Sequence, residues 1–71
     1  MIIYTKDSCG YCTQAKMHLQ NRGVEYKEIR LGKNITREEF IQLFPNVKSM
    51  PFIIDEDQQI GGYQQLLDYL P

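Results

Sequence analysis

The sequence predicts a single small α/β domain in which helices flank a mixed β-sheet. Short apolar runs typical of buried strands alternate with segments whose apolar residues recur at helical spacing, in the order β-α-β-α-β-β-α. With 71 residues, the chain suffices for one domain, so we expect residues 1–71 to fold as a unit. The first strand-helix-strand unit implies two parallel strands with a right-handed crossover, and the last two strands are close enough for an antiparallel hairpin.

The first half of the chain is expected to supply a strand, a helix and a second strand. Residues 2–4 form a short apolar run that predicts a buried strand. Residues 9–22 have helical periodicity, and Gly23 stands where a left-handed C-terminal cap is expected. Residues 24–29 alternate in polarity, which predicts the second strand, with Glu28 among its polar positions. The apolar face of the helix comprises Cys12, Ala15 and Leu19.

A second helix is predicted after a loop at residues 31–34. Thr36 and Glu39 have the spacing of a capping box, which marks the start of a helix. Pro45 ends this helix because proline cannot continue the hydrogen-bond pattern. Its apolar stripe comprises Phe40, Leu43 and Phe44.

The last third of the chain predicts a hairpin followed by a helix. Residues 52–54 are apolar and read as a third strand, the acidic residues 55–57 as a turn, and residues 58–60 as the start of a fourth strand. The glycines at 61–62 break that strand, and residues 63–70 have the apolar stripe of a final helix.

Composition and charge exclude several classes of protein. The chain is 42% hydrophobic with a net charge of −1, which is normal for a globular domain and unlike a disordered one. A nucleic-acid-binding protein would usually be strongly basic. No apolar run is long enough to span a membrane, and the N-terminus lacks the basic leader of a signal peptide. We therefore expect neither a nucleic-acid nor a membrane partner.

The two cysteines, Cys9 and Cys12, are poorly placed to stabilise the fold. A disulfide between them closes so small a loop that the chain-entropy model gives about 2 kcal/mol. It would also connect residues one helical turn apart, so it would hold no distant elements together. The pair therefore indicates a chemical role and not a structural one, and it favours a reducing compartment such as the cytoplasm.

Cys9 falls at the N-terminus of the predicted first helix, where an anion is favoured. Unpaired N–H groups and the helix dipole stabilise a thiolate there, and thiol pKa values in such motifs fall to about 3.5–7.5. Lys6 adds positive charge nearby, whereas Cys12 lies one turn further along, on the apolar face. This asymmetry predicts that Cys9 attacks a substrate disulfide and that Cys12 resolves the mixed disulfide.

Several residues have two interpretations from sequence alone. A CxxC pair can be half of a zinc site, but the only further candidate ligand is His18 on the same helix, so we expect no metal. Pro51 is either an ordinary trans loop proline or a cis proline whose preceding residue offers free backbone groups to a peptide substrate. Residues 61–63 are either a strand-to-helix break or a backbone cradle for a carboxylate. Tyr11 is expected to be exposed beside the cysteines.

Three segments occur in an informative order along the chain: Cys9-Gly10-Tyr11-Cys12, then Ser49-Met50-Pro51, then Ile60-Gly61-Gly62-Tyr63. Together they resemble the glutaredoxin family, over nearly the whole chain, and most of all short bacteriophage glutaredoxins. The resemblance implies a thioredoxin-like fold with a four-stranded mixed sheet in the order 2-1-3-4, flanked by three helices. It also implies reduction of protein disulfides and glutathione mixed disulfides, with glutathione as the reducing co-substrate, in the cytoplasm (that of the host for a phage protein).

The resemblance implies a role for individual residues. Cys9 is the nucleophile and Cys12 the resolving thiol. Pro51 would follow a cis peptide bond, and Met50 would pair through its backbone with the cysteinyl unit of glutathione. Lys6 would lie near the glycine carboxylate of glutathione or near the thiolate. The other expected contacts are Tyr11 beside the tripeptide, Lys48 at a position that is basic in some members, and Gly62, Tyr63, Gln64 and Gln65 at the γ-glutamyl end.

The chain departs from the family pattern in ways that affect the expected chemistry. Gly10 stands where the commonest active-site sequence has Pro, and some members without that Pro hold a [2Fe–2S] cluster between two subunits, with glutathione as co-ligand. Most members place Asp in the turn after the two glycines, where this chain has Gln64 and Gln65. Glutamine can accept a hydrogen bond from the γ-glutamyl ammonium but lacks the charge that makes such a bond strong.

The expected function is therefore that of a monomeric glutaredoxin-type thiol-disulfide oxidoreductase whose protein clients include ribonucleotide reductase. One alternative keeps the fold but takes electrons from thioredoxin reductase. A second alternative is a non-enzymatic dimer that binds a [2Fe–2S] cluster.

Overall fold

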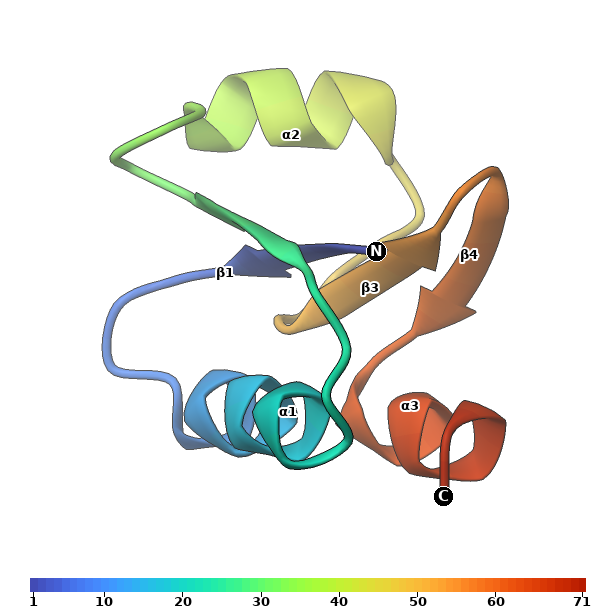
Figure 1. Ribbon diagram of the computed structural model, residues 1–71. Helices are drawn as coiled ribbons and strands as arrows, with labels where there is room; N and C mark the ends of the chain where they lie inside the picture. Colours follow the sequence, from blue (N-terminus) through green and yellow to red (C-terminus); the bar gives the residue numbers. More distant parts are fainter.

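Four strands form one mixed sheet in the order β2-β1-β3-β4, as Figure 1 shows. The computed structural model describes all of residues 1–71. β1 pairs with β2 in parallel and with β3 antiparallel, and β3 pairs antiparallel with β4. The elements are β1 (Ile2–Thr5), α1 (Gly10–Asn21), β2 (Lys27–Arg30), α2 (Arg37–Leu43), β3 (Phe52–Asp55), β4 (Gln58–Gly61) and α3 (Tyr63–Tyr69). The predicted element order, sheet order and three flanking helices are confirmed.

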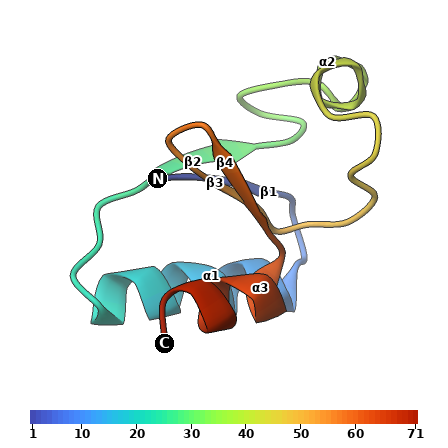
Figure 2. The ribbon, with the colours of Figure 1, turned by 90° about the vertical axis from the view of Figure 1, so that its right-hand side faces the viewer.

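The helices cover the two faces of the sheet unequally. α1 and α3 lie side by side on one face, and α2 lies alone on the other (Figures 1 and 2). Because successive strand residues point to opposite faces, β1 and β3 each contribute to both layers. Ile3, paired with Ile53, faces α1 and α3, whereas Tyr4, paired with Phe52, faces α2.

Two clusters of buried side chains result from this alternation. The aliphatic core, between the sheet and α1 and α3, comprises Ile3, Ala15, Leu19, Ile53 and Leu66, all of them fully buried. The aromatic core, beneath α2, comprises Tyr4, Phe40 and Phe52. Burying one large aliphatic or aromatic side chain contributes about 1.5–3 kcal/mol, so these few residues supply much of the stability of so short a chain.

The helix ends follow the chemistry expected of their sequences. At the start of α2, the Thr36 hydroxyl accepts a hydrogen bond from the Glu39 N–H, and the Glu39 carboxylate accepts one from the Thr36 N–H, both at 3.0 Å. This is the predicted capping box. After α1, Gly23 has a φ of +69°, the left-handed conformation that the sequence predicts and that side-chain-bearing residues disfavour.

β2 begins later than the alternation of residues 24–29 predicts. The Val24 N–H donates to the carbonyl of Leu19, so this residue takes part in the C-terminal cap of α1. The side chains of Val24 and Tyr26 pack against the aliphatic core on the way to the sheet, which produces the apolar alternation without a strand. Pairing with β1 begins at Lys27, opposite Ile2.

The two glycines before the last helix have different positions in the structure. Gly61 closes β4 instead of breaking it, and Gly62 becomes the N-cap of α3.

None of the three helices has the length and apolar character that crossing a membrane would require.

Candidate active site

Cys9 is the N-cap residue of α1, and Cys12 lies one turn inside the helix. The Sγ atom of Cys9 accepts a hydrogen bond from the Cys12 N–H at 3.1 Å, so it occupies the position where a capping oxygen is usually found. Cys12 is only 2% exposed, whereas Cys9 is partly exposed at the surface. The two residues are joined in a disulfide with their Cα atoms 5.2 Å apart. The more exposed of the two cysteines is therefore the one at the helix N-terminus, where a thiolate is stabilised.

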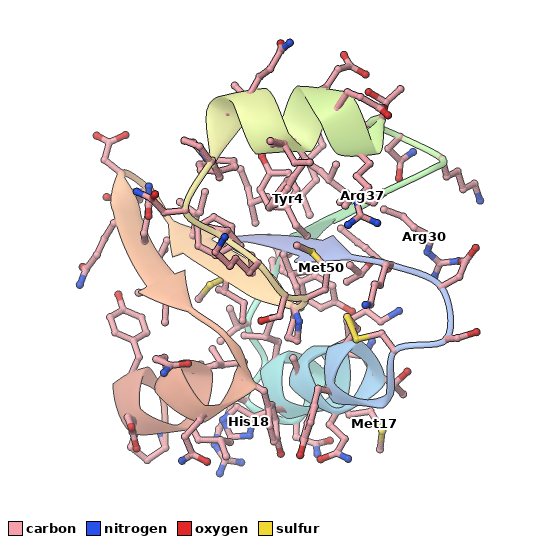
Figure 3. All side chains as sticks on the ribbon, turned by 180° about the vertical axis from the view of Figure 1, so that it is seen from behind. Tyr4, Met17, His18, Arg30, Arg37 and Met50 are labelled. Atoms are coloured by element: carbon pink, nitrogen blue, oxygen red, sulfur yellow. A yellow bond between two sulfur atoms is a disulfide. The ribbon has the colours of Figure 1, made fainter.

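The loop before β3 brings a free backbone segment next to this pair. The Met50–Pro51 peptide bond is cis, as the resemblance implies, and Pro51 is buried. The Met50 carbonyl oxygen lies 3.7 Å from the Sγ of Cys9. Figure 3 shows Met50 in the space between the α2 layer and the disulfide at the start of α1. An extended substrate bound to Cys9 would therefore meet the backbone of Met50.

Two tyrosines form one wall beside the cysteines. Tyr11, which is 62% exposed, stacks on Tyr63 with ring centroids 5.7 Å apart, so the N-termini of α1 and α3 are in contact. A shallow hollow of about 220 Å³ lies here, which we call the tyrosine hollow. It is lined by Tyr11, Met50, Pro51, Gly62, Tyr63 and Gln64.

The adjacent glutamines have different positions. Gln64 is exposed and lines the tyrosine hollow. The Gln65 side chain instead turns back to cap α3, because its Oε1 atom accepts a hydrogen bond from the Gly62 N–H at 3.0 Å. Of the four residues predicted at the γ-glutamyl end, the structure thus brings Gly62, Tyr63 and Gln64 to the hollow, while Gln65 does not line it.

A larger hollow of about 600 Å³ lies on the other side of Met50, beneath α2. Its polar rim carries the predicted residues Lys6 and Lys48 together with Arg37, and its lining contains no acidic residue. We call it the basic hollow. Arg37 was not predicted as a site residue, although the sequence offers one signal for it: a cation at the first position of a helix, where the dipole favours an acid. Figure 3 shows Arg37 at the end of α2 that faces the Arg30 side of the molecule.

A polar network behind the cysteines was not predicted. The Glu28 carboxylate accepts a hydrogen bond from the Thr5 hydroxyl at 2.6 Å and pairs with Lys16 at 3.2 Å and Arg30 at 3.4 Å. The Thr5 hydrogen bond lowers the pKa of Glu28 most, the Lys16 and Arg30 charges lower it further, and partial burial opposes them. Glu28 is therefore a carboxylate at neutral pH.

Comparison with known proteins shows to which family this chain belongs. The sequence model of the glutaredoxin family matches residues 1–60. The chain belongs to the glutaredoxin family. It is 38% identical over 71 residues to Glutaredoxin 1 of Rickettsia conorii, with 96% of this chain and 69% of that protein covered. It is 34% identical over 64 residues to Glutaredoxin 3 of Escherichia coli K12, with 90% of this chain and 77% of that protein covered.

Solved structures agree with the fold of this glutaredoxin. The solution structure of a Brucella melitensis glutaredoxin has a TM-score of 0.76 and 32% identity, and covers 94% of this chain and 73% of its own. A crystal structure of Glutaredoxin 1 from Francisella tularensis has a TM-score of 0.77 at 21% identity, and covers 94% and 86%. This glutaredoxin is accordingly a thiol-disulfide oxidoreductase with a thioredoxin-like fold. The likeness to bacteriophage members stays a prediction.

The glutaredoxin chain contains no group of three or more His, Cys, Asp or Glu side chains that could hold a metal ion. His18, the further zinc-ligand candidate, has its Nε2 atom 2.6 Å from the Leu70 carbonyl oxygen. It therefore connects the end of α1 to the residue after α3, a contact between residues far apart in sequence that no local pattern predicts.

Proposed function

We propose that this glutaredoxin reduces disulfides with glutathione, with Cys9 as the nucleophile and Cys12 as the resolving thiol. The observation that carries this assignment is the unequal placement of the two sulfurs. Cys9 caps the helix, accepts an N–H hydrogen bond and is open to a substrate, while Cys12 is buried behind it. A thiolate forms where it is stabilised and reacts where it is accessible, and both conditions favour Cys9.

The reaction exchanges two electrons in two steps. The Cys9 thiolate attacks one sulfur of a client disulfide, so that a Cys9–client disulfide forms and the other client sulfur leaves as a thiolate. Cys12, once deprotonated, attacks Cys9 in this mixed disulfide. The second client thiolate leaves, and the Cys9–Cys12 disulfide forms. The client has then gained two electrons that the cysteine pair has lost.

Glutathione reverses the oxidation of the pair. A glutathione thiolate attacks Cys9 because Cys12 is shielded, so that Cys12 leaves and takes up a proton. A second glutathione thiolate attacks the glutathione sulfur of the mixed disulfide, which releases glutathione disulfide and regenerates the Cys9 thiolate. A substrate in which glutathione is already joined to a protein needs Cys9 alone.

The surroundings of Cys9 support glutathione as the tripeptide bound here. The backbone of Met50, which lies beside Cys9 and precedes cis-Pro51, suits the extended cysteinyl unit, and the tyrosine hollow, with Gln64, suits the γ-glutamyl end. The basic hollow offers Lys6, Lys48 and Arg37 to the glycine carboxylate. An uncharged Gln64 supplies a weaker bond to the γ-glutamyl ammonium than a carboxylate would.

We further propose that the chain acts as a one-domain monomer in a reducing compartment such as the cytoplasm. Its protein clients would include ribonucleotide reductase. The support is the family membership, a cysteine pair that stabilises the fold little, and the absence of any other cysteine that a structural disulfide would need.

The test offers each reducing system alone to the oxidised protein. We expect turnover with glutathione, glutathione reductase and NADPH, and little with thioredoxin reductase and NADPH. Cys9→Ser should abolish turnover of every substrate. Cys12→Ser should still reduce a glutathione mixed disulfide but lose the reduction of protein disulfides. Turnover by Cys9→Ser but not by Cys12→Ser would reverse the assigned roles, and turnover with thioredoxin reductase alone would replace glutathione as the donor.

A further inference from the structure

One acidic side chain pairs with two cations that lie near the cysteine pair. Glu28, on β2, contacts Lys16 of α1 and Arg30 of β2 with the same carboxylate. Its side chain is 27% exposed, and the Thr5 hydroxyl, which belongs to a 1% exposed residue, holds it in place. Such a carboxylate compensates two positive charges at a fixed position, not at a freely moving surface site.

The same two cations line the hollow that contains both cysteines. This hollow, of about 330 Å³, is formed where the β1–α1 loop meets α1 and β2, and we call it the cysteine hollow. Cys9 and Cys12 share it with the cations Lys6, Lys16 and Arg30. Its only acidic lining residue is Asp7, which is largely exposed and pairs with Arg30 at 3.4 Å. Figure 3 shows Arg30 on the side of the molecule where the disulfide lies.

We propose that Glu28 tunes the Cys9–Cys12 pair by offsetting the positive charge of Lys16 and Arg30, which keeps the pair more reducing than these cations alone would make it. This inference rests on the proposed role of Cys9 as a thiolate. Positive charge stabilises a thiolate and hence the reduced pair, which makes a disulfide a stronger oxidant. A nearby carboxylate acts in the opposite direction, and Glu28 is ionised at neutral pH.

The charges that face the cysteine hollow from every side define the balance. Lys6 and Asp7 come from the β1–α1 loop, Lys16 from α1, and Arg30 from β2, with Glu28 behind the last two. Three cations and two acids leave a net positive surrounding. Glu28 is the member of this set that can be neutralised without removing a lining residue of the hollow.

The first test replaces Glu28 by the uncharged isostere. In E28Q we expect the thiolate-to-thiol ratio of Cys9 at a fixed pH to rise about threefold, which is a fall of about 0.5 in the thiol pKa. The equilibrium of the pair with a dithiothreitol redox buffer should shift about threefold toward the dithiol, which is about 14 mV more oxidising. Alkylation of Cys9 against pH and the redox equilibrium measure the two quantities.

Two more variants separate charge balance from simple structural support. K16Q should shift both quantities in the opposite direction, and the double variant E28Q/K16Q should return close to the unmodified protein. E25Q, which removes an exposed acid before β2, is the matched control and should change neither. Circular dichroism checks that each variant folds.

The results of these variants would either support the proposal or overturn it. No shift in folded E28Q, or a double variant shifted further than either single one, would overturn the proposal. If E28Q failed to fold, the sign of the K16Q shift would decide. The redox equilibrium uses the pair itself, so a confirmed shift together with a protein that glutathione does not turn over would reject the proposed function and leave this inference standing.

Discussion

The helices on the two faces of the sheet differ in how closely they pack against it. On one face, α1 buries Cys12, Ala15 and Leu19, and α3 adds Leu66, so the aliphatic core is fully closed. On the other face, α2 buries only Phe40, leaves Leu43 60% exposed and stands over the basic hollow of about 600 Å³. The thiols are thus held by the tightly packed layer, and the space that we propose for substrate lies beneath the more loosely packed one.

The largest expected effect is on the packed face. Leu19→Ala should destabilise the protein by about 2–5 kcal/mol because it leaves a cavity in the aliphatic core. A chain of this length is expected to have about 4–10 kcal/mol of stability in total, so this loss is severe. Ile41→Ala on α2, at a residue 47% exposed, should change stability by no more than about 0.5 kcal/mol. Denaturant unfolding measures both, and equal losses would contradict the comparison.

On the open face, the expected effect is on substrate rather than on stability. Arg37→Gln should raise the KM for glutathione about fivefold, with kcat little changed, because the proposed charge-assisted contact to the glycine carboxylate is lost. The glutathione-coupled assay measures both constants. Lys33→Gln, which removes an exposed cation outside the basic hollow, is the control. An unchanged KM in Arg37→Gln would remove this residue from the site.

The attachment of α2 should depend on its cap. Thr36→Ala removes the hydroxyl that accepts the Glu39 N–H, and we expect a loss of about 1 kcal/mol in the free energy of unfolding. Thr36→Ser keeps the hydroxyl and should restore most of it. Thermal unfolding of the three proteins in parallel would show whether the cap stabilises the loosely packed helix as proposed.

The smallest expected effect links the Glu28 network to pH. Its folded-state pKa is lowered below the ordinary value of 4.5, so ionised Glu28 stabilises the folded state above about pH 4.5. This contribution is lost as the pH falls through the lowered pKa. Because the side chain is partly exposed, we expect less than about 1 kcal/mol. The difference in unfolding free energy between the unmodified protein and E28Q should shrink between pH 7 and pH 3, and a constant difference would argue against it.

Local patterns in the sequence predict most of the fold. The capping box at Thr36, the left-handed Gly23 and the apolar face of α1 are interactions within a few residues, so they can be read directly. The start of β2 could not be read in this way. Val24 and Tyr26 look like strand residues because they are apolar at alternate positions, yet they pack against the core before pairing with β1 begins.

Some residues of the candidate site could likewise be predicted from local sequence, and others could not. The cysteine pair, Lys6 and Met50 follow from their place beside a helix start or a proline, and the structure brings them together. The Glu28 network escapes prediction because its partners Thr5 and Lys16 are distant in sequence, and only the fold places Arg37 beside Lys6. Thr5 meets Glu28 only through the parallel pairing of β1 and β2, which brings together two side chains that are 23 positions apart in the sequence.

The capping of α3 has a consequence for changing substrate affinity by design. Gln64 and Gln65 are neighbours of the same residue type, yet one is available to a ligand and the other is committed to its own helix. A negative charge placed at position 64 would face the tyrosine hollow, where we propose that the γ-glutamyl ammonium binds. The same charge at position 65 would take over the hydrogen bond from the Gly62 N–H and would point back at the start of α3, so two neighbouring positions differ in whether an added charge is available to a ligand.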